Sequence, residues 1–246
     1  MTGEAGDLLM PKLTAMMLVR NEADRYLRPC LDSLSKYVDS IVILDDASED
    51  NSAEVCLSYP NVTLHRQSHS TFLQNEAILR EKLWHHTQND NPEWILAVDA
   101  DEFLEESIIK ESPYLLRQKY FNAISFRLFD CWESEEYYRC DGLWNPWRRG
   151  FSIYMVRYLP ALSSDWPALK FHCGRLPSAY RRLQHYESTV RIKHLGWANA
   201  ANNLTKYDRA VGQDPGSKYM SQEHYKSILW PPEKVKLEKW VEHLST

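Results

Sequence analysis

Two aspartates separated by a single residue form the first group that could do chemistry. Asp99 and Asp101 flank Ala100 directly after an apolar run. In extended backbone, side chains two residues apart point to the same face of a strand. Two carboxylates on one face offer the hard oxygen ligands that Mg²⁺ or Mn²⁺ prefers. Aspartates also serve turns and helix caps, so the pair alone leaves a structural interpretation open.

A second acidic pair, Asp45 and Asp46, ends another apolar run. Carboxylates accept hydrogen bonds from the imide N–H of uracil and from ribose hydroxyls. Taken alone, the pair is more typical of a turn before a helix that starts near Asp50. Together with Asp99 and Asp101 after a later apolar run, it favours a ligand-binding interpretation.

The elements that must position these acids alternate between buried strands and helices. Apolar runs typical of strands covered on both faces occupy residues 13–19, 41–44 and 94–98, with a shorter run at 61–65. Apolar residues recur at helical spacing over 26–38, and a helix is expected at 72–87. This alternation predicts an α/β fold with a mostly parallel sheet flanked by helices. Ligands of such sheets bind beyond the carboxyl ends of the strands, so we expect one cleft to collect the polar clusters.

The pattern changes after about residue 120, where aromatic and β-prone segments predict a mixed β region. We predict a single α/β domain with additions. Its segments are an N-terminal tail (1–11), a βα half (12–120), a second half of the same domain (121–197) and a C-terminal helical extension (198–246). A helix is expected at 199–211, and the irregular stretch 163–186 is predicted to be a mobile loop over the cleft.

Composition excludes several classes of protein. The 246 residues carry a formal net charge of -5, so no general field favours nucleic acid. No apolar run is long enough to cross a bilayer, and residues 1–7 lack a secretory leader pattern, which predicts a cytoplasmic protein in which peripheral membrane contact stays possible. The five cysteines form no CxxC pair and are expected to be reduced. No GxGxxG or GxxxxGK[ST] motif supports a dehydrogenase or an ATPase.

Three motifs in this order resemble the family 2 glycosyltransferases of the GT-A fold, in their bacterial form. They are Met17–Glu22, Ile43–Asp50 and Val98–Glu102. The resemblance covers about residues 12–105, and a looser likeness extends to His194–Trp197 and to residues 206–228. It implies a nucleoside-diphosphate-sugar donor, with a UDP-sugar favoured, a Mn²⁺ or Mg²⁺ ion, and a glycan, lipid-linked or small-molecule acceptor that supplies a hydroxyl. On this resemblance, residues 12–120 would be the nucleotide-sugar-binding half, and residues 121–197 would be the acceptor-side and catalytic half.

The resemblance also implies roles for individual residues. Asp99 would meet the ribose or the water shell of the metal, Asp101 would bind the metal that bridges the diphosphate, and His194 would complete the metal site. A hydrogen-bonded structural histidine is the alternative for His194. The nucleotide pocket would be formed by Val19, Arg20, Asn21, Glu22, Asp45, Asp46, Asp99, Ala100 and Asp101.

An inverting transferase needs a base within hydrogen-bond reach of the acceptor hydroxyl. Asp141, which is followed by glycine, is the preferred candidate, and Glu135 and Glu136 are the reserves. The common Glu-Asp base motif of the family is absent, which leaves the base and the inversion open. Trp132, Trp144 and Trp147 could stack on a sugar or fill the core.

Two other functions remain alternatives. A phosphatase or phosphotransferase of the aspartyl-phosphate type also places a DxD at a strand end, but its motif normally follows the first strand. A non-catalytic module that binds nucleotide sugars would keep the same acids without turnover.

Overall fold

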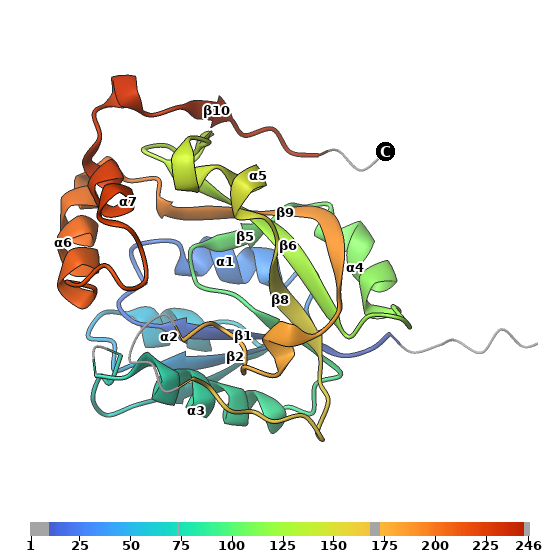
Figure 1. Cartoon of the computed structure of the whole chain (residues 1–246). Helices are drawn as coiled ribbons and strands as arrows, with labels where there is room; N and C mark the ends of the chain where they lie inside the picture. Colours follow the sequence, from blue (N-terminus) through green and yellow to red (C-terminus); the bar gives the residue numbers. More distant parts are fainter. Residues whose placement is uncertain (1–9, 73, 168–172, 244–246) are drawn as a thin grey trace, which may run out of the picture.

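The computed structural model describes residues 10–72, 74–167 and 173–243 (Figure 1). Its strands are β1 (Leu13–Val19), β2 (Ser40–Asp45), β3 (Val62–Arg66), β4 (Trp94–Ala97), β5 (Glu102–Leu104), β6 (Ala123–Trp132), β7 (Tyr137–Arg139), β8 (Ser152–Arg157), β9 (His185–Trp197) and β10 (Leu237–Lys239). Its α-helices are α1 (Leu27–Leu34), α2 (Ser52–Leu57), α3 (Glu76–Gln88), α4 (Ile108–Leu116), α5 (Pro146–Arg149), α6 (Asn203–Gln213) and α7 (Gln222–Lys226).

The first half of the sheet is parallel, in the order β4, β1, β2, β3. Alternate residues of β1 pack on opposite faces because a strand turns successive side chains to opposite sides. Met17 packs in one core cluster with Leu31 of α1, and Met16 packs in another with Leu83 of α3. Burial on both faces explains why these strands read as continuous apolar runs.

The second half of the sheet is mixed. β8 pairs antiparallel with β4, and β6 pairs antiparallel with β8. The long strand β9 runs parallel to β6 and antiparallel to the short strand β5. In this last pairing, Glu102 lies opposite His194. The turn that carries Asp99 and Asp101 is thereby held against the end of β9.

The C-terminal segment returns across the end of the mixed half (Figure 1). β10 pairs antiparallel with β7. The fully buried guanidinium of Arg139 on β7 donates from Nη1 to the carbonyl oxygen of Ser227, 2.7 Å away, and stacks on the rings of Trp132 and Trp144. These contacts fasten the chain after α7 to the sheet.

Several predicted boundaries were wrong by a few residues. The helix expected from residue 72 begins at Glu76, because the side chain of Asn75 caps it by accepting from the N–H of Ala77. The helix expected from residue 199 is a short 3₁₀ turn followed by α6. Helix α4 follows only at Ile108, because the residues directly after Asp101 form β5 and pair with β9.

Other predictions concern the cysteines, the loop and membrane spans. All five cysteines are buried and free. The stretch expected as a mobile loop over 163–186 lies partly outside the described residues, and the described part holds a 3₁₀ turn at Tyr180–Arg182 with Tyr180 buried. Within the described ranges, no helix is both long and apolar enough to span a bilayer.

Candidate functional site

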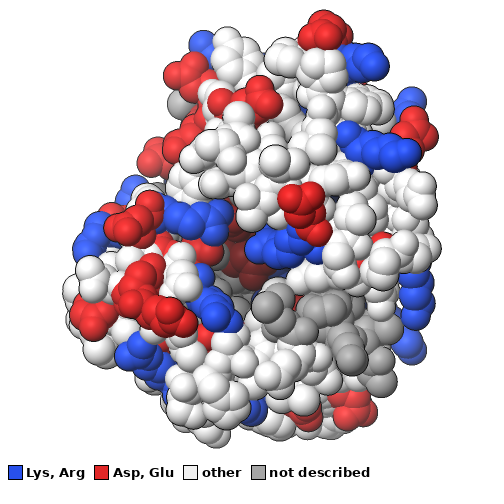
Figure 2. Space-filling view, turned by 90° about the vertical axis from the view of Figure 1, so that its left-hand side faces the viewer, with Lys and Arg blue, Asp and Glu red and all other residues white. Residues whose placement is uncertain are grey.

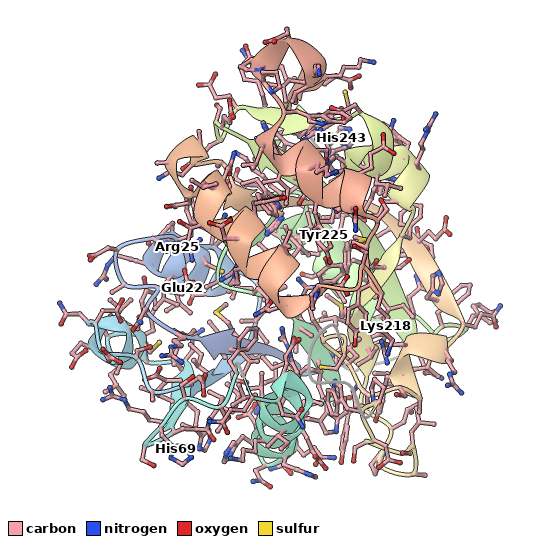
Figure 3. All side chains as sticks on the ribbon, turned by 60° about the vertical axis from the view of Figure 1, so that its left-hand side comes forward. Glu22, Arg25, His69, Lys218, Tyr225 and His243 are labelled. Carbon is pink, nitrogen blue, oxygen red and sulfur yellow. The ribbon has the colours of Figure 1, made fainter. Side chains whose placement is uncertain are left out.

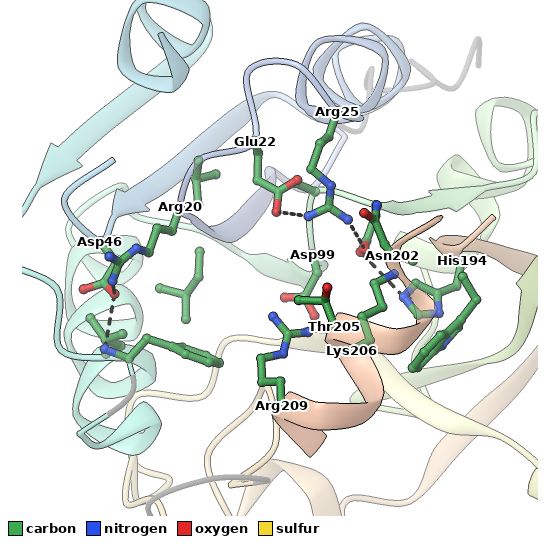
Figure 4. A pocket seen from close by; sticks show the side chains of 18 of the residues that line it. Arg20, Glu22, Arg25, Asp46, Asp99, His194, Asn202, Thr205, Lys206 and Arg209 are labelled. Carbon is green, nitrogen blue, oxygen red and sulfur yellow. Dashed lines mark hydrogen bonds and ion pairs between the residues drawn. The ribbon is translucent and has the colours of Figure 1, made fainter. Parts of the chain in front are cut away.

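A cavity of about 570 Å³ opens beyond the carboxyl ends of β1, β2 and β4, with α6 on its opposite wall (Figure 4). Figure 2 shows a hollow with acidic side chains at its bottom and basic side chains around it. The residues that line the cavity are Leu18, Val19, Arg20, Glu22, Arg25, Asp46, Phe72, Leu79, Arg80, Asp99, Ala100, Asp101, His194, Gly196, Trp197, Asn202, Thr205, Lys206 and Arg209.

Most of the residues predicted for a nucleotide and metal site line this one cavity. They are Val19, Arg20, Glu22, Asp46, Asp99, Ala100, Asp101 and His194. Parallel strands bring them together because their carboxyl ends lie at one edge of the sheet. The other predicted residues do not line it. They are Asn21, Asp45, Glu135, Glu136 and Asp141.

Asn21 and Asp45 organise the loops behind the cavity wall. Asn21 has a positive φ of 54°, and its Oδ1 accepts from the N–H of Glu49, 2.8 Å away. The buried Asp45 accepts from the N–H of Ser48 at 2.9 Å and pairs with Arg66 at 3.0 Å. Both side chains therefore fix the two loops that carry Arg20 and Asp46.

Asp46 ties the loop after β3 to the end of β2. Its Oδ1 accepts from Nε2 of Gln67 and from the N–H of Thr71, each at 2.9 Å, and its Oδ2 accepts from Oγ of Ser70 at 2.6 Å. Arg20 lies 3.7 Å from the same carboxylate. The side chain is nearly buried, so it shapes the wall of the cavity as well as lining it.

Asp99 is held by two arginines. Arg80 of α3 reaches its Oδ1 at 3.3 Å, and Arg175 reaches its Oδ2 at 2.8 Å. Burial works against ionisation, but Arg175 and Arg80 outweigh it and lower the pKa of Asp99. Arg175 also pairs with the buried Glu102. β4 ends at Ala97, and Ala100 and Asp101 form a turn, so the expected extended strand through the two aspartates was wrong, although both carboxylates face the same cavity.

Asp101 and His194 lie side by side at the inner end of the cavity. Nε2 of His194 is 3.7 Å from Oδ1 of Asp101, and its Nδ1 is 2.6 Å from Oδ1 of the buried Asp130. Burial opposes the charge of His194, but Asp101 and Asp130 outweigh it and raise the pKa of the imidazole to about 10. Burial likewise opposes ionisation of Asp101, and His194 lowers the pKa of this carboxyl well below its usual range. The site thus favours positive charge between two carboxylates.

Gly196 leaves the space that these two residues need. A Cβ at this position would collide with Nε2 of His194 and lie 3.1 Å from Oδ2 of Asp101. Any larger residue would therefore push the imidazole away from the carboxylate.

The donor set at Asp101 and His194 fits a Mg²⁺ or Mn²⁺ ion that receives its remaining ligands from phosphates and water. Such ions are commonly held by one or two protein ligands together with substrate oxygens. The contact of Asp130 with Nδ1 is the arrangement that fixes a metal-binding imidazole. No group of three or more potential protein ligands occurs in the described part of the chain, and Asp99 is occupied by arginines. Asp101 and His194 would therefore hold the ion only together with oxygens of the substrate and water.

Glu22 and Arg25 form the upper rim of the cavity in Figure 4. Oε1 of Glu22 accepts from Nη1 of Arg25 at 2.6 Å, and Nη2 of Arg25 lies 3.9 Å from Oδ2 of Asp101. Burial raises the pKa of Glu22 to about 7. Its Oε2 is buried without a hydrogen-bond partner among the described atoms. A hydroxyl of a bound ligand would satisfy this oxygen.

α6 and α3 bring to the cavity further residues that were not predicted from the sequence. Lys206 and Arg209 come from α6, and Arg80 comes from α3. Lys206 belongs to residues 206–228, where the resemblance to the family is looser. No local pattern identifies these cations, because their place depends on how a distant helix packs over the sheet.

The candidates for a catalytic base lie elsewhere. Asp141 accepts from Nε and Nη2 of Arg139 at 3.0 and 2.9 Å and from the N–H of Lys236 at 2.9 Å. Glu135 and Glu136 lie exposed in the turn between β6 and β7. In this arrangement Asp141 joins β7 to the C-terminal segment.

The aromatic residues divide into buried and exposed ones. Trp132 and Trp144 are buried and pack against each other with ring centres 4.9 Å apart, so both belong to the core. Trp147 is 61% exposed and lies outside the cavity lining. Arg149, at the end of α5, forms an ion pair with Asp130 in which Nη1 lies 2.7 Å from Oδ2.

Comparisons with known proteins agree with the geometry. The sequence model of the family described as "Glycosyl transferase family 2" matches residues 14–165. An uncharacterized protein of Mycobacterium tuberculosis is 25% identical over 223 residues, which cover 85% of this chain and 52% of the relative. The chain thus spans about half the length of that relative.

Solved structures share the fold. S. aureus TarS, residues 1–349, superposes with a TM-score of 0.52 and 16% identity over 89% of this chain and 69% of that chain. The same fragment in complex with UDP gives a TM-score of 0.50 and 14% identity, over 89% and 69% of the two chains. The likeness shows that the central sheet and its helices form a GT-A fold.

Proposed function

The chain belongs to glycosyl transferase family 2, and on this premise we propose that it moves a sugar from a nucleoside-diphosphate sugar to an acceptor hydroxyl with the help of a divalent metal. The observation that carries the proposal is the gathering of Asp46, Asp99, Asp101 and His194 in one cavity. A UDP-sugar is the favoured donor, which the UDP complex of the TarS fragment supports.

Different residues along the cavity would bind the nucleoside, the ribose and the diphosphate of such a donor. We place the nucleoside near Arg20 and Asp46, where polar groups of three loops converge. Asp99, oriented by Arg80 and Arg175, would accept a hydrogen bond from a ribose hydroxyl. The diphosphate would then lie toward Asp101.

Asp101 and His194 would hold Mg²⁺ or Mn²⁺, which supplies Lewis-acid neutralisation of the leaving diphosphate. Asp130 would keep the imidazole in place through Nδ1. With its Oε2 unpartnered, Glu22 would accept a hydrogen bond from a hydroxyl of the substrate. These groups are partly shielded from solvent, which strengthens their electrostatic interactions relative to those in bulk water.

The proposal is less specific about the acceptor and the catalytic base. Inversion requires a carboxylate beside the acceptor hydroxyl, and Asp141, Glu135 and Glu136 would have to approach the cavity to provide it. The acceptor is a glycan, a lipid-linked glycan or a small molecule. Family membership favours this transfer over aspartyl-phosphate chemistry, for which Asp99 would have to be free of its two arginines.

The test is a screen of UDP-, GDP- and dTDP-sugars for slow hydrolysis, with and without Mn²⁺. We expect release of the sugar from one class of donor, stimulated by Mn²⁺ and lost in Asp101→Ala. Glu187→Ala, an exposed acid on β9 outside the cavity, is the matched control and should keep the activity. If every donor stays intact and none raises the melting temperature, the transferase proposal is wrong. Binding without any hydrolysis would favour the non-catalytic alternative.

A further inference from the structure

The wall of the cavity that faces the sheet is built by α6, and it carries two cations. Lys206 and Arg209 project from this helix into the cavity, across from Asp99 and beside His194 (Figure 4). Figure 3 shows α6 lying over the open end of the sheet, with Glu22 and Arg25 at one side of it. These cations come from a part of the chain beyond the matched family region.

The other cations of the cavity have carboxylate partners. Arg80 pairs with Asp99, Arg25 with Glu22, and Arg20 lies 3.7 Å from Asp46. Their charges are therefore already balanced within the protein.

Lys206 and Arg209 differ in this respect. Neither forms an ion pair or a hydrogen bond within the described ranges, and Nζ of Lys206 lies over the ring of Trp197, 4.8 Å from the ring centre. Burial, together with the nearby charge of Arg25, lowers the pKa of Lys206 to about 8. Asp101 and Glu22 attract the charge of Lys206 only from beyond ion-pair distance. The two cations thus face the cavity without a carboxylate paired to either of them, which is a favourable setting for a bound anion.

Their position specifies which anion. Lys206 lies beside His194 in Figure 4, and its charge acts on Asp101, so it is close to the two residues where a divalent ion fits. The metal alone would neutralise the charge of a mononegative ligand. A diphosphate carries more negative charge, and it has further oxygens that can accept hydrogen bonds from a second set of donors. Lysine and arginine are the side chains suited to such oxygens.

We infer that Lys206 and Arg209 of α6 form the second half of a diphosphate-binding site, opposite the metal-binding half at Asp101 and His194. The inference rests on the proposed function and deepens it. In this arrangement the two cations hold the nucleoside diphosphate from the C-terminal side and stabilise it as the leaving group.

The test is calorimetric titration of the full chain with UDP and with uridine, in EDTA, so that the metal does not contribute. We expect the wild type to bind UDP more tightly than uridine. Lys206→Gln and Arg209→Gln should each weaken UDP by about tenfold, the scale of one charge-assisted hydrogen bond, and leave uridine unchanged. Lys206→Arg should restore most of the loss. Lys226→Gln, an exposed lysine on α7 outside the cavity, is the control and should bind as the wild type does.

The outcomes separate the two proposals. If UDP and uridine bind the wild type equally, or if both glutamine variants keep full UDP affinity, the inference about α6 is wrong while the proposed donor site stands. If neither ligand binds the wild type with or without Mn²⁺, the proposed function itself fails, and the inference falls with it. Equal melting temperatures of the variants and the wild type verify that α6 is still folded.

Discussion

Nε2 of His194 lies 3.7 Å from Oδ1 of Asp101, and the pairing of β5 with β9 is what brings them together. The N–H of Leu195 donates to the carbonyl oxygen of Asp101 at 2.8 Å, so the backbone fixes the approach of the two side chains. A carboxylate from the turn after β4 and an imidazole from the end of β9 thus form one candidate metal site.

His194→Ala should remove the metal-dependent part of nucleotide binding. UDP with Mn²⁺ is expected to raise the melting temperature of the wild type more than UDP alone, because the ion joins protein and diphosphate. In the variant the two shifts should be equal. His185→Ala, at the other end of β9 and outside the cavity, should behave as the wild type does. A full Mn²⁺ effect in His194→Ala would exclude the imidazole as a ligand.

Asp130→Asn should weaken metal binding, although Asp130 contacts His194 and is not a proposed ligand of the metal. Asp130 accepts from Nδ1 of His194, and loss of such a partner typically lowers metal affinity by about 10- to 100-fold. Titration of Mn²⁺ into the UDP complex measures the effect. Because Asp130 also pairs with Arg149, Arg149→Gln serves as the control. An equal loss in both variants would assign the effect to the arginine instead of the histidine.

Asp141→Asn separates a structural role from a catalytic one. Its carboxylate neutralises the fully buried Arg139. Leaving that charge unpaired should lower the free energy of unfolding by about 3 kcal/mol, as measured by urea denaturation. Glu136→Gln, in the exposed turn before β7, should have no effect on stability. Unchanged stability with lost turnover in Asp141→Asn would instead support its role as the acceptor-side base.

Glu22→Gln should change the pH dependence of stability. Burial raises the pKa of Glu22 from 4.5 to about 7, so between these values the folded state binds more protons than the unfolded state. The corresponding stability is present at low pH and is lost as the pH rises through about 7. Glutamine imitates the protonated form and does not titrate. Without metal or nucleotide, the variant should therefore match the wild type near pH 4.5 and melt at a higher temperature than the wild type near pH 8.

Melting curves across this pH range measure the difference between the two proteins. Asp24→Asn, an exposed acid in the same loop, is the control and should show no such trend. A constant difference at every pH would mean that Glu22 titrates as an ordinary exposed carboxyl does.

The sequence by itself determined the parallel half of the fold and the edge at which the acids meet. Buried strands need apolar residues on both faces, so 13–19 and 41–44 were visible as strands without any knowledge of the structure. Polar residues directly after such strands must lie at one edge of a parallel sheet. That rule placed Asp46 and Asp101 in a common cavity.

Only the tertiary structure decided what surrounds those acids. The pairing of β9 with β5, the packing of α6 over the cavity and the reach of Arg175 to Asp99 all join segments far apart in the chain. Such contacts depend on register and on the path of loops, which leave no periodic signal in the sequence. For the same reason the sequence could not place Asp141, which lies outside the cavity lining and accepts a hydrogen bond from the N–H of the distant Lys236.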